Sequence, residues 1–227
     1  MIWAADFRER SSMLLRGESS DLTLHLQKVT DMTTEAAEFD QAFIAWSKSV
    51  PDDWQFSCHS FANDLYPTIP DDFLFQRSIH RYSSYGHAAM WIQYRAVRLI
   101  LNSVRLQLLS DLAQCSGQEY SLNAELEMCQ NNISSLATDF CYSVPVFFRS
   151  MIDYNRMGCR STSTVCLENP IDPKMAAILA CPMALAVTTQ VIPKAQKRWL
   201  QQRLKIIANV IGATQLHATA DREDVAA

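Results

Sequence analysis

The chain has 227 residues with 48% apolar and 19% charged side chains, which is enough apolar material for a sizeable buried core. Its net charge of −4 argues against a nucleic-acid-binding domain, which normally carries a basic footprint. Only 5 glycines are present and apolar residues seldom alternate with polar ones, so the composition favours an all-α protein.

The N-terminal residues and the cysteines indicate a cytosolic or nuclear protein. The first residues, MIWAADFRERSSMLL, carry too many charges for a secretory signal. The cysteines are odd in number, scattered and often on apolar helix faces, which favours reduced, buried thiols. They are Cys58, Cys115, Cys129, Cys141, Cys159, Cys166 and Cys181.

The first clear helical stripe follows steps of three and four residues. It consists of Ala36, Phe39, Phe43 and Trp46. Asp31 or Thr33 is the expected N-cap, and Pro51 is the expected end. Residues 51–70 contain three prolines and several aromatic residues, which predicts an irregular but packed connection.

Two longer helices are expected next. Residues 79–112 carry a wide apolar stripe, which is typical of a central helix touched from more than one side. A second stripe runs from Leu122 to Phe140 and leads into DFCYSVPVFF, which contains Pro145. Proline lacks a backbone donor and clashes with the preceding turn, so we expect the helix to bend or restart at Pro145.

The C-terminal part predicts a surface loop after Asn155 and then two helices, at residues 173–190 and 193–212. Residues 175–192 lack charged side chains, which meets the length criterion for a membrane span. The segment is rich in alanine, ends in Thr188, Thr189 and Gln190, and is interrupted by Pro182. These features favour a buried core helix with a structural proline over a span.

The sequence offers no compact catalytic or metal-binding motif. Cys159 and Cys166 lack the close CxxC pairing of structural zinc sites, and no GxGxxG, Walker or GxSxG motif occurs. We therefore expect no catalytic residue, no metal and no cofactor. The alternative is a helical enzyme or an accessory protein of a biosynthetic pathway, for which the available groups are His80, His87, Asp72 and Asp139.

A cluster of aromatic residues is the candidate effector pocket. Core packing is the ordinary role of such side chains, but they also line ligand sites. The pocket candidates are Trp54, Phe56, Trp91 and Tyr94.

Three segments occur in a recognisable order. The first is SIHRYSSYGHAAMWIQYRAVRLILNSVRLQLL at residues 78–109, with the pattern A-x-x-W-x-x-Y-R-x-x-R. The second is ISSLATDFCYSVPVFF at residues 133–148. The third, at residues 175–216, combines an apolar helix containing Cys181-Pro182 with R-W-L-x-x-R-L and I-G-x-x-Q.

This order resembles the regulatory region of fungal transcription factors of the zinc binuclear cluster class, over about residues 46–216. Asp139, Cys141, Ser143, Val144 and Pro145 fit the family's D-I-C-x-S-V-P-F-like segment, while Cys181 stands where the family commonly has tryptophan. The six-cysteine, basic DNA-binding signature of the family is missing from this sequence. The resemblance therefore describes a regulatory region without its DNA-binding module, as a truncated regulator, a fragment or a stand-alone relative.

The resemblance implies a non-catalytic domain of about six to eight packed helices, with a long central helix and helices interrupted by proline. Residues 1–30 would form an N-terminal helical extension, residues 31–220 one regulatory domain, and residues 221–227 a disordered tail. It would act in the nucleus, or alternatively in the cytoplasm, through protein partners of the transcription machinery or as a homodimer. A small effector is a further option, whereas direct nucleic-acid binding and membrane association are not expected.

Overall fold

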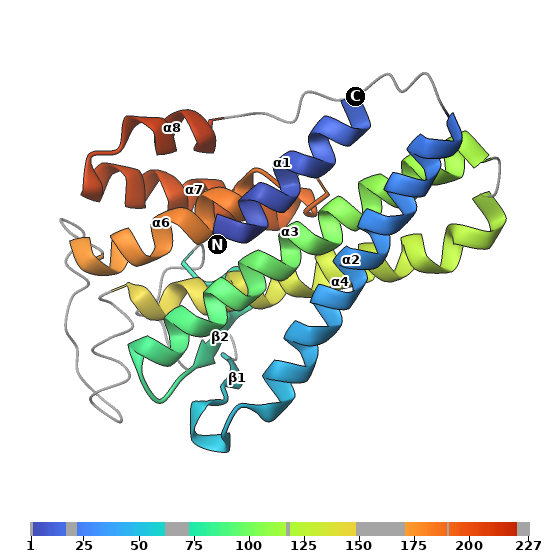
Figure 1. The fold of residues 1–227 in the computed structure, drawn as a ribbon. Helices are drawn as coiled ribbons and strands as arrows, with labels where there is room; N and C mark the ends of the chain where they lie inside the picture. Colours follow the sequence, from blue (N-terminus) through green and yellow to red (C-terminus); the bar gives the residue numbers. More distant parts are fainter. Residues whose placement is uncertain are drawn as a thin grey trace, which may run out of the picture. The chain divides into compact units, whose positions relative to one another are not determined.

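The computed structural model describes residues 2–16, 22–61, 73–116, 119–148, 171–189 and 191–221. These residues form seven α-helices and one small two-stranded sheet, which confirms the all-α, multi-helix prediction (Figure 1). The helices are α1 (Ile2–Arg16), α2 (Leu22–Ser49), α3 (Tyr85–Ser116), α4 (Glu119–Ser143), α6 (Pro173–Val187), α7 (Lys194–Ile211) and α8 (Thr214–Ala220).

The chain divides into two compact units. Unit 1 consists of Met1–Val50 and Val97–Leu136, and unit 2 consists of Pro51–Ala96 and Ala137–Ala227. The domain boundary expected between residues 30 and 31 falls inside α2. The predicted disordered tail comprises residues 221–227. Its first residue, Asp221, forms an ion pair with Lys205 at 2.6 Å, and residues 222–227 lie outside the described residues.

In unit 1, α2 is longer than its stripe predicted. It begins at Leu22, so Asp31 and Thr33 are internal and the predicted N-caps are wrong. The Thr33 hydroxyl donates to the Val29 carbonyl at 2.8 Å, as an internal helical threonine does. The helix ends at Ser49, just before Pro51 as expected, because proline cannot supply the next helical donor.

In unit 2, a hairpin replaces the predicted start of the long helix. Strand β1 (Ser57–Ser60) pairs antiparallel with β2 (Ser78–Arg81), and Cys58 lies opposite His80. The helix α3 therefore begins at Tyr85 rather than near Ile79. The sequence did not predict this sheet.

The C-terminal helices α6, α7 and α8 of unit 2 pack against one another (Figure 1, orange to red). The Asp172 carboxylate caps α6 by accepting from the Lys174 backbone N–H at 2.8 Å, and Pro182 lies buried inside this helix. Gly212 ends α7 in the left-handed conformation, with φ of 70°. Among the described residues, no helix is both long and apolar enough to cross a membrane.

Pro145 lies in a short 3₁₀ helix rather than in the path of a continuing α-helix. The α-helix α4 ends at Ser143, and η3 (Val144–Phe147) follows with all four residues buried. Phe148 then bridges to Ile171. The chain thus restarts at Pro145 as a tighter turn, one of the two outcomes that the sequence predicted.

Candidate functional site

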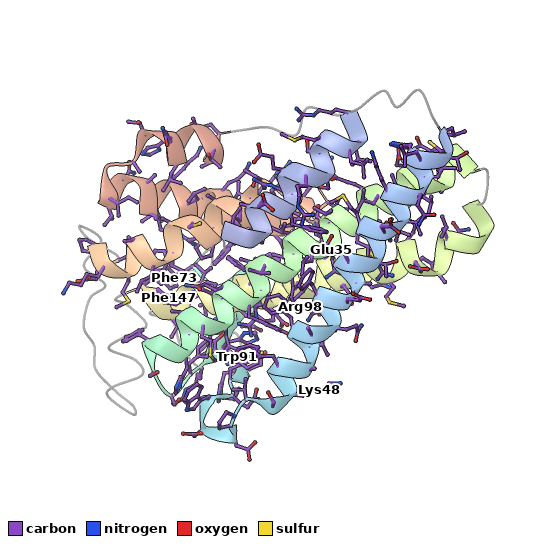
Figure 2. All side chains as sticks on the ribbon, in the orientation of Figure 1. Glu35, Lys48, Phe73, Trp91, Arg98 and Phe147 are labelled. Atoms are coloured by element: carbon purple, nitrogen blue, oxygen red, sulfur yellow. The ribbon has the colours of Figure 1, made fainter. Side chains whose placement is uncertain are left out.

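The structure brings together all four aromatic residues of the candidate pocket, within unit 2. Trp91, labelled in Figure 2, lies on α3 and is 3% exposed. It donates its indole N–H to the Trp54 carbonyl at 2.8 Å. Its ring meets Phe56 edge-on at 5.0 Å between centroids and Tyr94 at 5.2 Å. Trp54, at the end of η1 (Asp52–Trp54), remains 42% exposed, so the cluster reaches the surface.

A buried arginine that the sequence reading did not single out lies at the centre of this cluster. Arg95 is 1% exposed, and its Cζ lies 4.4 Å from the Phe56 ring centroid and 5.4 Å from that of Trp91. Its Nη1 donates to the Tyr82 hydroxyl at 2.8 Å. Its Nη2 is buried without a hydrogen-bond partner among the described residues, and no carboxylate in that part of the chain pairs with it.

The hydrogen bonds around Ser143 run in one direction, because both ends of the chain of bonds are fixed. A guanidinium can only donate and a backbone carbonyl can only accept. Arg95 donates to Tyr82, and the Ser143 hydroxyl donates to the Asp139 carbonyl at 2.6 Å. Tyr82 therefore donates to Ser143 Oγ at 2.9 Å, and His80 Nδ1, 3.2 Å away, is the protonated nitrogen of that ring.

His80 is held neutral at physiological pH. Its side chain is 2% exposed and its ring stacks at a tilt on Phe56, with centroids 4.4 Å apart. Burial, together with the positive charge of Arg95, lowers the pKa of His80 to about 3. Nε2 of this ring lies 3.6 Å from Asp139 Oδ1.

His80 lies between Ser143 and Asp139, as the histidine of a hydrolytic serine–histidine–aspartate triad does. The protonation of Ser143 and His80 differs from that of such a triad. In an activated triad the serine proton points at the histidine nitrogen that will remove it. Here the Ser143 proton is committed to a carbonyl, and Ser143 has no exposed surface. A histidine with a pKa near 3 is also a poor general base at neutral pH.

Of the remaining predicted groups, only His87 lies within the described residues, and it contacts this cluster at Trp54. His87 stacks on Trp54 with ring centroids 4.9 Å apart. The Ser83 hydroxyl donates to the Asp53 carbonyl at 2.6 Å, so His87 Nδ1, 2.6 Å from Ser83 Oγ, is the donor of that second hydrogen bond. Asp72, Cys159 and Cys166 lie outside the described residues.

A second group of side chains lies in unit 1 and was missed by the sequence analysis. His25 Nε2 on α2 is 3.0 Å from Asp111 Oδ2 on α3, and the Cys115 thiol lies within 4.8 Å of both ligand atoms. Asp111 and Cys115 are four residues apart, which is the one signal that sequence could offer. His25 precedes Asp111 by 86 residues, so no local pattern joins the three.

Comparison with known proteins adds no family assignment. No protein-family model matches the chain, and neither the curated proteins nor the solved structures give a match.

Proposed function

We propose that this chain is a non-catalytic helical regulatory module of the fungal transcription-factor type. It acts in the nucleus through protein contacts and binds a small anionic effector at Arg95. The observation that carries the proposal is that Nη2 of Arg95, which is 1% exposed inside an aromatic cluster, has no hydrogen-bond partner among the described residues.

An anionic effector follows from the energetics of that arginine. A buried charge is costly unless an opposite charge and hydrogen bonds compensate for it. Phe56 and Trp91 offer their ring faces to Arg95, and Tyr82 accepts one hydrogen bond. Within the part of the chain that the structure describes, no carboxylate balances this positive charge. A carboxylate is the anion that a guanidinium recognises most readily with two parallel hydrogen bonds.

The regulatory class rests on the resemblance and on where its residues lie. Parts of all three resembling segments fall in unit 2. Two of them meet at Ser143, which binds His80 and Tyr82 from the entry to α3 and belongs to the segment around Pro145. Tyr82 and Trp91 of the first segment also contact Arg95, which links the regulatory class to the effector site.

A reporter experiment tests the regulatory role. The chain is fused to a heterologous DNA-binding domain in a fungal host, and a reporter carrying the matching operator is measured. We expect the fusion to change reporter output relative to the DNA-binding domain alone. A folded, nuclear fusion that leaves the reporter unchanged would overturn the regulatory role.

A binding experiment tests the effector class separately. Tryptophan fluorescence is titrated with a panel of small aromatic and aliphatic carboxylates and with their amides. We expect a saturable change with a carboxylate, none with its amide, and loss of the change in Arg95→Met. The matched control is Arg81→Met, because Arg81 is an exposed arginine of the neighbouring strand β2. Equal responses from Arg95→Met and the control would exclude Arg95 as the anchor.

The second candidate function is hydrolysis, and the approach of Ser143, His80 and Asp139 is the observation that favours it. Two observations argue against hydrolysis, namely that Ser143 donates its proton to a carbonyl and that His80 is a weak base. A fluorophosphonate probe for activated serines separates the two proposals. We expect the wild type and Ser143→Ala to be labelled equally, because Ser143 is not activated. Labelling that is lost in Ser143→Ala would favour the enzyme.

A further inference from the structure

We propose that His25, Asp111 and Cys115 form a zinc-class metal site that joins α2 to α3 within unit 1. The site is independent of the cluster around Arg95 and goes beyond the proposed regulatory function. It is formed by the only group of three or more metal-ligating side chains found among the described residues.

The backbone sets the three ligands on converging positions. Residues four apart on an α-helix share a face, so Asp111 and Cys115 present their side chains one turn apart on α3. His25 approaches from α2 and already contacts the Asp111 carboxylate at 3.0 Å. Three ligands from two rigid helices make a more precise site than ligands from a loop.

The distances suit a small tetrahedral ion after a modest adjustment. Nitrogen and oxygen ligands at about 2.0–2.1 Å from a tetrahedral zinc ion lie roughly 3.3 Å from each other. His25 Nε2 and Asp111 Oδ2, at 3.0 Å, need to separate by only a few tenths of an ångström. The Cys115 thiol, within 4.8 Å of both, approaches by rotation about its single side-chain torsion.

The mixture of ligands selects the class of metal. A thiolate and an imidazole disfavour Mg²⁺ and Ca²⁺, which prefer oxygen ligands, and favour Zn²⁺ and its neighbours in the first transition row. Three protein ligands leave a fourth tetrahedral position, which water can fill because Cys115 is exposed. The site therefore has the ligand count of an open zinc site.

Without a metal, the same residues form an ordinary histidine–aspartate hydrogen bond beside an exposed thiol. The two states differ in whether Cys115 contributes. In the hydrogen-bonded pair Cys115 is unnecessary, whereas in the metal site it is the softest ligand and carries much of the selectivity. The test must therefore report on the sulfur.

Cobalt(II) substitution in the full chain provides that readout. Tetrahedral Co²⁺ bound to a thiolate gives a sulfur-to-metal charge-transfer band in the near ultraviolet. We expect the wild-type chain to show this band at one equivalent of Co²⁺, and Zn²⁺ to remove it by displacing Co²⁺. We expect Cys115→Ser to abolish the band and to weaken Zn²⁺ binding by more than about tenfold, measured by competition with a chromophoric chelator.

Matched variants make the outcome decisive. Cys58→Ser and Cys181→Ser remove other exposed thiols and should keep the band. His25→Gln keeps a hydrogen-bond donor for Asp111 but removes the imidazole, so it should weaken Zn²⁺ binding without unfolding the chain. Absence of the band in the wild type would overturn the proposal. So would a band that survives in Cys115→Ser and disappears in a Cys159→Ser, Cys166→Ser double variant.

Discussion

Asp40 on α2 and Arg98 on α3 form a two-pronged ion pair inside unit 1, with Nε to Oδ1 at 2.6 Å and Nη2 to Oδ2 at 2.9 Å (Figure 2 labels Arg98). Asp40 is 5% exposed. Asn102 donates to the same carboxylate at 3.0 Å, and Asn132 on α4 donates to Asn102 at 3.0 Å. One buried carboxylate therefore connects three helices of the unit.

Removing that carboxylate should destabilise the protein strongly. In Asp40→Ala the guanidinium and one amide donor lose their acceptor, and breaking a buried pair from one side costs about 3–5 kcal/mol. Urea unfolding measures the change. The control is Asp6→Ala, which breaks the exposed pair with Arg10 and should cost less than about 1 kcal/mol. Similar costs for the two variants would mean that the network does not stabilise unit 1.

The neutral, buried His80 predicts that stability falls in mild acid. Its pKa is about 3 in the folded chain against 6.5 in the unfolded chain, so between these values only the unfolded chain binds the proton. The stabilising contribution is therefore fully present above pH 6.5 and is lost as the pH falls toward 3. The slope approaches about 1.4 kcal/mol per pH unit.

The measurement compares wild type with His80→Phe at pH 7 and pH 5. We expect the wild type to lose about 2 kcal/mol more than the variant over this interval, from the same slope. The neighbouring charged and titratable groups are Arg95, Asp139, Tyr82 and Cys58, which are present in both proteins. The exposed His59→Phe should follow the wild type, and a wild type that parallels His80→Phe would contradict the assigned pKa.

Arg95 should be dispensable for stability even though it is buried. Replacing a buried charge by an apolar residue of similar volume is often neutral or stabilising, so Arg95→Met should leave the free energy of unfolding unchanged or raise it. Tyr82→Phe should lower it by about 1 kcal/mol, because Arg95 loses its hydrogen-bond acceptor and Ser143 loses a donor. Thermal and urea unfolding of both variants provide the check, and a loss of several kcal/mol in Arg95→Met would show that Arg95 is structural.

The helices were predictable because their apolar residues recur at helical spacing. Leu101, Val104 and Leu108 of the long stripe are all buried on α3, and Ile133 and Phe140 are buried on α4. The sequences of strands β1 and β2 carry no comparable periodic pattern. All four residues of β1 are exposed and three of the four in β2 are buried, so neither strand alternates.

The sequence singled out the four aromatic residues that meet at Trp91, but it did not single out Arg95 beside them. Arg95 lies four residues from Trp91 and four from Leu99, both buried, so its position on the inner face of α3 was readable from the stripe. That no carboxylate of the described residues pairs with Arg95 could not be predicted, because it depends on side chains from distant segments. The contact of His25 with Asp111 could not be predicted for the same reason, because Asp111 lies on another helix.

Two glycines should respond to alanine in opposite directions. Gly212 ends α7 with φ of 70°, and an added Cβ there meets no atom within 4 Å, so the cost is purely conformational. An L-residue in this left-handed region costs about 1–2 kcal/mol, so Gly212→Ala should destabilise by that amount. Gly212→Asn should cost less, because asparagine tolerates the left-handed region.

Gly86 provides the matched comparison in the first turn of α3. Its φ is not positive, and an added Cβ would lie 3.6 Å from Ser84 Oγ, which is an ordinary contact. Alanine is favoured over glycine in a helix and restricts the unfolded chain, so Gly86→Ala should stabilise by about 0.5–1 kcal/mol. Chemical unfolding of the two alanine variants and of Gly212→Asn gives the three values. A Gly212→Ala variant as stable as Gly86→Ala would mean that α7 does not end in the left-handed turn, because only that conformation separates the two sites.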